Sequence, residues 1–137
     1  MESQFGAVIV AAGSSSRMGG SVSKVLEPLG GKPVLLYSFE TLAASPWVKE
    51  LCVVCREEDS QQVQALLSGK TDKPVCVVPG GRERQESVLN GVTALDPETG
   101  YLLIHDGARP FVTLDMIDGV CRDALDCGAA TAAVPSK

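Results

Sequence analysis

The sequence has 137 residues, of which 45% are hydrophobic and 4% aromatic, and it carries a formal net charge of -5. This length suits one domain with its own core. An acidic chain with few aromatic side chains lacks the positive charge and the stacking surface that nucleic acids require, so nucleic acid is excluded as a partner. No apolar run approaches the ~18 residues that span a bilayer, and the first residues lack the basic segment of a secretory signal. We therefore expect a cytoplasmic protein with no membrane partner.

The cysteines predict buried thiols and no metal or redox centre. They lie in apolar surroundings, which is typical of free cysteines in an intracellular core: Cys52, Cys55, Cys76, Cys121 and Cys127. Only Cys52 and Cys55 have a spacing that resembles a metal or redox motif. They fall in a strand-like run, where residues three apart point to opposite faces of a sheet. We therefore predict core packing for both, without a zinc site or a disulfide.

Apolar runs and amphipathic stretches alternate along the chain. A first strand is predicted over 5–12, ending in small residues that lead into a loop rich in glycine and serine. Pro33 then opens a helix at a position where its missing N–H costs nothing, and Pro46 ends that helix. The later elements, in chain order, are a strand over 51–55, a helix over 59–67, a strand over 75–78, a helix over 84–95, a strand over 101–104, a helix over 114–125 and a strand over 129–134.

This order of elements predicts an α/β fold. Continuous apolar strands separated by helices indicate a Rossmann-like, mostly parallel sheet with helices on both faces. No internal repeat or interdomain linker is visible, so we expect one α/β domain over 1–137. Parallel sheets bind ligands beyond the carboxyl ends of their strands. The loops after the first, third and fourth predicted strands are therefore the candidate site.

The loop after the first strand is small, hydroxylated and basic. It has neither the G-x-G-x-x-G of dinucleotide-binding folds nor the glycine spacing of a P-loop. Its small residues let backbone N–H groups approach an anion closely, and three consecutive serines from Ser14 add hydroxyl donors. Three cations, Arg17, Lys24 and Lys32, outnumber the one carboxylate of Glu27 in a chain that is acidic as a whole. We therefore expect this loop to bind an anion.

The loop after the third strand holds paired glycines. Gly80 and Gly81 predict a tight turn with φ > 0, in which exposed backbone amides hydrogen-bond the polar edge of a ligand. Ser87 lies one turn into the following helix and is placed to point back at the same ligand.

The loop after the fourth strand holds a carboxylate at the end of the strand. Asp106 lies beside small residues, where it is well placed to hold a hard cation on phosphate oxygens. For the neighbouring His105 we expect a hydrogen-bonded structural role. Arg109 fits an ion-paired scaffold role and a functional role equally.

Together the three loops resemble one family. The segment Val10-Ala-Ala-Gly-Ser-Ser-Ser-Arg-Met-Gly with Lys24 is similar to the signature loop of sugar-nucleotidyltransferases. The segments Gly80-Gly81-x-x-Arg84-x-x-Ser87-Val88 and His105-Asp106-Gly107-Ala108-Arg109-Pro110 narrow the resemblance to the 2-C-methyl-D-erythritol 4-phosphate cytidylyltransferases of isoprenoid synthesis. The resemblance covers the whole chain.

The resemblance implies an enzyme that transfers CMP from CTP to 2-C-methyl-D-erythritol 4-phosphate, a polyol phosphate, and releases pyrophosphate. It implies Mg²⁺ or another divalent cation as cofactor, held in part by Asp106, and catalytic roles for Arg17 and Lys24. The implied nucleotide-binding residues are Ala11, Ala12, Gly13, Ser14, Ser15 and Ser16 around the triphosphate, Gly81 and Ser87 at the cytosine, and also Gly80, Arg82, Asp106, Gly107 and Arg109.

The chain departs from the family pattern at three positions. The family usually has glycine where Ser15 stands and proline where Ser23 stands, and an acidic residue is common where Arg82 stands. These departures concern the geometry of the first loop and the contact with the base, and leave Arg17 and Lys24 in place.

The implied chemistry agrees with the residues present. A phosphate monoester is largely dianionic at pH 7, since its second pKa is ~6, so the nucleophile needs no general base. The chain has one histidine and no nucleophilic serine or cysteine motif. The remaining task is to align two polyanions and neutralise charge at the attacked phosphorus, for which cations suffice.

Members of the family continue beyond Lys137, so we expect a truncated chain that binds CTP and transfers little on its own. In the family, the later part supplies ligands for the acceptor phosphate, a second metal-binding aspartate and the arm that forms a homodimer.

Three alternatives remain open. A ribitol-5-phosphate cytidylyltransferase shares the chemistry, but often has Ala-Gly-Gly where this chain has Ala11-Ala12-Gly13. A non-catalytic nucleotide-binding module would be expected to have lost Arg17, Lys24 and Asp106. A molybdenum-cofactor nucleotidyltransferase is disfavoured by the segments that begin at Gly80 and His105.

Overall fold

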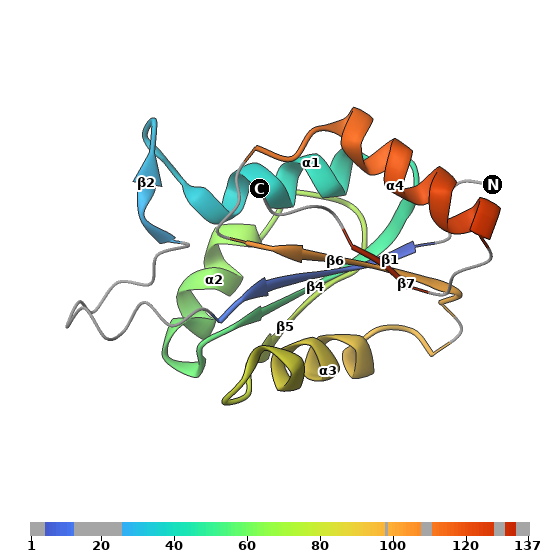
Figure 1. Cartoon of the computed structure of the whole chain (residues 1–137). Helices are drawn as coiled ribbons and strands as arrows, with labels where there is room; N and C mark the ends of the chain where they lie inside the picture. Colours follow the sequence, from blue (N-terminus) through green and yellow to red (C-terminus); the bar gives the residue numbers. More distant parts are fainter. Residues whose placement is uncertain (1–4, 13–25, 98, 108–110, 128–130, 134–137) are drawn as a thin grey trace.

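The fold is a five-stranded parallel sheet between helices, as predicted (Figure 1). The computed structural model describes residues 5–12, 26–97, 99–107, 111–127 and 131–133. The main sheet has the order β5-β4-β1-β6-β7, and every neighbouring pair is parallel. Its strands are β1 (Phe5–Ala11), β4 (Val48–Cys55), β5 (Val75–Pro79), β6 (Tyr101–Asp106) and β7 (Thr131–Ala133). The helices are α1 (Val34–Ala44), α2 (Ser60–Leu67), α3 (Arg84–Ala94) and α4 (Leu114–Cys127), with a short 3-10 turn, η3 (Glu57–Asp59).

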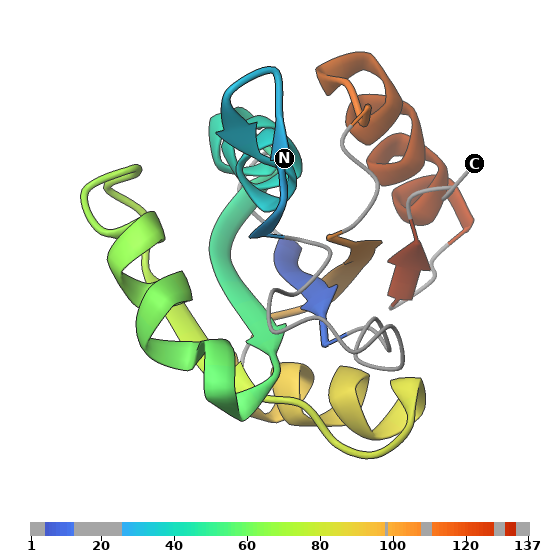
Figure 2. The same ribbon diagram turned by 90° about the vertical axis from the view of Figure 1, so that its left-hand side faces the viewer.

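Helices cover both faces of the sheet, but unequally (Figure 2). The face under α1, α2 and α4 buries the larger core, which includes Phe39, Val63 and Ile117 from these three helices. Among the described helices, α3 alone covers the opposite face, where Val8 and Val54 are buried. Within the described residues, no helix combines the length and the hydrophobicity that crossing a bilayer requires.

The element boundaries follow the apolar pattern closely. Pro33 is the residue before α1, as its missing N–H favours, and Pro46 follows the C-cap Ser45. β4 begins at Val48, three residues before the predicted strand, because its first residues pair with β1 at the sheet's amino end. β6 continues to Asp106, beyond the predicted end, because it stays in register with Val10 of β1. Part of the last predicted strand, 129–130 and 134, lies outside the described residues.

A small hairpin was not predicted from the sequence. The strands β2 (Pro28–Leu29) and β3 (Lys32–Pro33) form a separate two-stranded antiparallel sheet. The turn between them uses Gly30 and Gly31, both at positive φ (65° and 85°), a conformation that glycine adopts without strain. Strands of two residues carry no periodicity, so the sequence pattern offered no signal for them.

The two cysteines of the Cys52-x-x-Cys55 spacing lie on opposite faces of β4, as predicted. Cys52 belongs to the core under α3, and Cys55 to the core on the other face. Both are fully buried, free thiols. Burial raises the pKa of the Cys55 thiol to about 11, so it stays protonated and unreactive at neutral pH.

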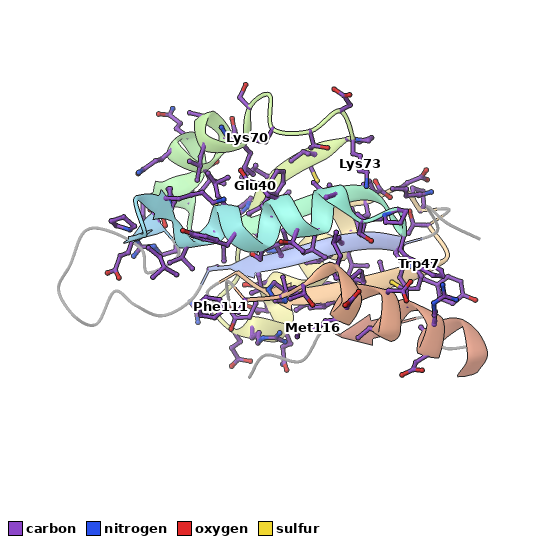
Figure 3. The ribbon with its side chains drawn as sticks, turned by 90° about the horizontal axis from the view of Figure 1, so that it is seen from above. Glu40, Trp47, Lys70, Lys73, Phe111 and Met116 are labelled. Carbon is purple, nitrogen blue, oxygen red and sulfur yellow. The ribbon has the colours of Figure 1, made fainter. Side chains whose placement is uncertain are left out.

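The amino edge of the sheet is closed by an aromatic cluster around Trp47, which Figure 3 shows beside α4. Phe5 packs edge-on against Trp47 with ring centroids 6.0 Å apart. The Trp47 Nε1–H donates to Asp118 of α4 at 2.9 Å, and Arg122 pairs with the same carboxylate at 2.9 Å. The hydrogen bonds from Trp47 and Arg122 lower the pKa of Asp118. These contacts fix α4 to the sheet at the end opposite the predicted site.

α3 packs directly on the sheet because of a glycine. A Cβ added at Gly91 would lie 2.6 Å from Val8 Cγ1 and 2.8 Å from Val54 Cγ2. Real Cβ atoms do not tolerate such contacts, so only glycine lets the helix come this close to β1 and β4.

We expect Gly91→Ala to lower the free energy of unfolding by about 1–3 kcal/mol, because overpacking outweighs the better helix propensity of alanine. Gly119→Ala in α4 is the matched control. A Cβ there meets no atom within 4 Å, so we expect a gain of about 0.5–1 kcal/mol. Urea denaturation measures both changes, and a stabilising effect at both positions would contradict the close packing of α3.

Candidate functional site

The carboxyl ends of four parallel strands meet at one edge of the sheet. In the strand register, Ala11 of β1 lies beside Cys55 of β4, and Cys55 lies beside Pro79 of β5. On the other side of β1, Val10 lies beside Asp106 of β6. The segments that follow these strands therefore leave the sheet side by side, as the sequence predicted.

The segment after β5 crosses the end of β4 and touches the segment after β1. The Gly80 N–H continues the ladder by donating to the Cys55 carbonyl at 2.8 Å. A Cβ added at Gly80 would lie 2.5 Å from the Ala12 Cβ and 2.7 Å from the Ser87 Oγ. The structure thus brings together three of the predicted site residues, Ala12, Gly80 and Ser87.

The expected positive φ at Gly80 and Gly81 is wrong. Among the described glycines, the left-handed region is occupied by Gly30, Gly31 and Gly69 instead. Glycine is required at 80 and 81 because a side chain there would collide with neighbouring atoms. A Cβ added at Gly81 would lie 2.4 Å from the Cβ of Glu86. The paired glycines therefore allow close approach of backbone to side chains.

The amides of this loop, expected to be exposed, are instead bonded to the protein at three positions. The Gly81 N–H donates to the Ser87 Oγ at 3.1 Å, and the Arg82 N–H donates to the Glu86 carboxylate at 2.7 Å. With the Gly80 N–H on Cys55, three consecutive amides are bonded to the protein. A loop whose N–H groups are committed in this way offers a ligand its carbonyl oxygens.

Ser87 is a buried residue of the first turn of α3, and its hydroxyl bonds the preceding loop. It is 2% exposed, and its own N–H donates to the Glu83 carbonyl at 3.1 Å in the first turn of α3. Its hydroxyl accepts from Gly81, so the side chain does point back at the loop, as predicted. Arg82, by contrast, is exposed at the tip of the loop.

β6 ends at Asp106 at this edge, and Gly107 follows it. The Gly107 N–H donates to the Val10 carbonyl at 2.8 Å, which holds the segment against β1. Side chains alternate along a strand, and Ile104 packs in the core under α3, so Asp106 points to the same side as α3. His105 points to the other side and is 1% exposed; the hydrogen-bonded structural role expected for it stays a prediction.

Two cations near this edge are neutralised by carboxylates of the protein. Lys32, which the sequence counted toward an anion-binding loop, pairs with Glu40 of α1 at 2.6 Å. Arg56 follows β4 directly, and its guanidinium bonds both oxygens of the buried Asp59 at 2.9 and 3.3 Å. Asp59 thereby raises the pKa of Arg56. Neither cation carries an unmatched charge toward a ligand.

Two residues that shape the loop were missed in the sequence. Glu86 accepts from the Arg82 N–H, and the Asn90 side-chain amide donates to the Pro79 carbonyl at 3.0 Å. The available signal was an acidic residue at the third position of the helix, the place from which a capping side chain reaches back.

Some predicted residues lie outside the described part of the chain. They are Gly13, Ser14, Ser15, Ser16, Arg17, Lys24 and Arg109. Their roles stay predictions. Asp106 is the described residue predicted to hold a metal; within the described residues, no three His, Cys, Asp or Glu side chains are grouped to hold one.

Comparison with known proteins agrees with this arrangement. The family model described as "IspD: 2-C-methyl-D-erythritol 4-phosphate cytidylyltransferase" matches residues 5–137. The 2-C-methyl-D-erythritol 4-phosphate cytidylyltransferase of Caldanaerobacter subterraneus is 43% identical over 133 residues, which are 96% of this chain and 59% of that protein. The enzyme of the same name from Streptomyces coelicolor is 44% identical over 135 residues, 95% of this chain and 48% of that protein.

A solved structure shows the same fold. The 4-diphosphocytidyl-2C-methyl-D-erythritol synthase of Anaerococcus prevotii superposes with a TM-score of 0.78 at 27% identity, over 90% of this chain and 52% of that chain. The chain thus spans about half to three-fifths of the length of these relatives. It belongs to the 2-C-methyl-D-erythritol 4-phosphate cytidylyltransferase family.

Proposed function

We propose that the protein transfers CMP from CTP to 2-C-methyl-D-erythritol 4-phosphate and releases pyrophosphate, with CTP bound at the carboxyl edge of the sheet. One observation supports the location of the proposed nucleotide site. Gly80 of the loop after β5 lies against Ala12 of the loop after β1, so a single ligand can contact both loops. Family membership supports the choice of reaction.

The loop after β5 suits the base of the nucleotide better than its phosphates. Phosphates require donors, whereas the N–H groups of Gly80, Gly81 and Arg82 are already bonded to the protein. The carbonyl oxygens of such a loop are acceptors for an amino group. Cytosine carries an N4 amino donor, and uracil has an acceptor in its place, so this loop favours CTP over UTP.

The triphosphate then belongs to the loop after β1, where Arg17 and Lys24 stand in the sequence. An oxygen of the acceptor phosphate attacks the α-phosphorus of CTP, the bond to the β-phosphate bridging oxygen breaks, and pyrophosphate leaves with the electron pair. Because the nucleophile is already anionic, the enzyme has to align the reactants and stabilise the charge that develops. Arg17 and Lys24 are the residues proposed to supply that stabilisation.

Mg²⁺ fits the residues at this edge. Magnesium in nucleotide sites is usually held by one or two carboxylates together with phosphate oxygens, and Asp106 supplies a carboxylate at the end of β6. When bound, the ion would neutralise charge on the triphosphate. Asp106 would hold it, and the protein's own cations would act on the reacting phosphate.

Two further properties of the protein, its location and its oligomeric state, are proposed. The buried free thiols of Cys52, Cys55 and Cys121 fit a reducing compartment, which supports a cytoplasmic location. The family resemblance supports a homodimer for the full-length protein.

The assay that tests the function measures pyrophosphate release by the full-length protein with each pair of CTP or UTP and 2-C-methyl-D-erythritol 4-phosphate or ribitol 5-phosphate. We expect release with CTP and the erythritol phosphate. Release with ribitol 5-phosphate in its place would overturn the proposed acceptor.

We expect Arg17→Ala and Lys24→Ala each to lower turnover by about 10²–10³, the cost typical of removing one transition-state donor. Lys70→Ala is the control, because Lys70 is an exposed lysine beside α2, away from the site (Figure 3). Single-turnover kinetics with saturating CTP isolate the chemical step. Near-normal turnover in Lys24→Ala with Arg17 intact would refute the role of Lys24.

We expect Asp106→Asn to raise the Mg²⁺ concentration for half-maximal activity by at least about 10-fold, because a neutral amide is a weaker ligand for a hard cation. Asp72→Asn, at an exposed turn before β5, is the control. Titration of activity with Mg²⁺ at fixed CTP gives the value. An unchanged Mg²⁺ requirement would remove Asp106 from the metal site.

A further inference from the structure

The loop that precedes α3 leads from the end of β5 into the helix (Figure 1), and three side chains of α3 hold it. Asn90 donates to the Pro79 carbonyl at 3.0 Å, Ser87 accepts from the Gly81 N–H at 3.1 Å, and Glu86 accepts from the Arg82 N–H at 2.7 Å. One helix thus fixes the chain at Pro79, where β5 ends, and at Gly81 and Arg82 of the loop.

Two of these side chains, Glu86 and Asn90, are exposed, whereas Ser87 is buried. An exposed glutamate or asparagine ordinarily extends into water, because ordering it costs side-chain entropy. Here both turn back onto the backbone of one loop. The backbone of Gly81 lies so close to Glu86 that a Cβ would meet the Glu86 Cβ at 2.4 Å and its Oε1 at 2.7 Å.

We infer that Glu86 and Asn90 are positioning residues that set the preference of this site for CTP over UTP. The inference rests on the proposed function. Glu86 binds the Arg82 N–H and so removes one donor from the loop, beside the Gly80 and Gly81 N–H groups that are also bonded to the protein. Asn90 fixes the peptide at Pro79, where the loop leaves β5 and begins to cross toward Ala12.

A structural role alone would have a different signature. If the two side chains only stabilised the start of α3, their loss would lower the free energy of unfolding and leave the ratio of CTP to UTP affinity unchanged. If they position the loop, loss of Glu86 frees the Arg82 N–H to donate to the O4 of uracil, and loss of Asn90 releases the loop at the Pro79 carbonyl. Selectivity between the two nucleotides therefore separates the two roles.

The test compares matched variants of the full-length protein. Glu86→Met removes the acceptor at similar length, and Glu86→Gln keeps a carbonyl acceptor without the charge. Asn90→Leu removes the donor at similar size. Thr93→Val is the control on the same helix face, because Thr93 donates to the Leu89 carbonyl at 2.8 Å and touches no loop residue through that bond.

Two measurements are made on each variant: amide hydrogen exchange at Arg82, and the dissociation constants of CTP and UTP by calorimetry. We expect Glu86→Met and Asn90→Leu to weaken CTP binding by about 3- to 10-fold, the value of one hydrogen bond, and to narrow the CTP-to-UTP ratio by a similar factor. Exchange at Arg82 should quicken in Glu86→Met. Glu86→Gln and Thr93→Val should match the wild type in both measurements.

Two results would overturn this inference and leave the proposed function intact. The first is an unchanged ratio of CTP to UTP affinity in Glu86→Met and Asn90→Leu while the wild type binds CTP. The second is an equal loss of CTP affinity in Glu86→Gln and Glu86→Met. A wild-type protein that binds neither nucleotide would overturn the proposed function as well, so the two failures are distinguishable.

Discussion

The site depends on the absence of a side chain at Gly80. β5 and β1 are separated by β4 in the sheet, so their loops meet only if one of them crosses the end of β4. Gly80 does this while its N–H still bonds Cys55, and its bare Cα lies against Ala12 and Ser87. Any larger residue would push the two loops apart. The contact turns two separate loop segments into one surface, and the order of the strands alone would not produce it.

Much of the fold could be predicted because its signals are local and repetitive. The strands β1 and β5 are continuous apolar runs, β4 and β6 each contain one, and the apolar stripe of α1 follows helical spacing. The hairpin of β2 and β3 was missed because two-residue strands have no period. The positive φ at Gly80 and Gly81 was wrong for a different reason. A glycine pair shows that a side chain is excluded, but only the tertiary structure shows whether the backbone angle or a neighbouring atom excludes it.

The sequence predicted where the candidate site lies, but it did not predict which groups its polar side chains contact. Parallel topology places Ala12, Gly80 and Asp106 at one edge, and the structure confirms this. The partners of the polar groups depend on side-chain conformations that no motif encodes. Lys32 looked like an anion-binding cation until its pairing with Glu40 was visible. Glu86 and Asn90 were overlooked because each is an ordinary polar residue on an exposed helix face. Their significance comes only from the backbone groups that they bind.

The unequal covering of the sheet has a consequence for motion. α3 is docked on the smaller of the two cores, whereas α1, α2 and α4 share the larger one. Segments with less buried apolar surface open more often, and they define the least stable cooperative unit of a domain. We therefore expect the layer of α3, with the loop that it holds, to open more often than the layer of α1, α2 and α4. A ligand that bridges the loops after β1 and β5 would bind only the form in which α3 is docked. Its binding would therefore reduce the opening of the α3 layer and leave the opening of the opposite layer almost unchanged.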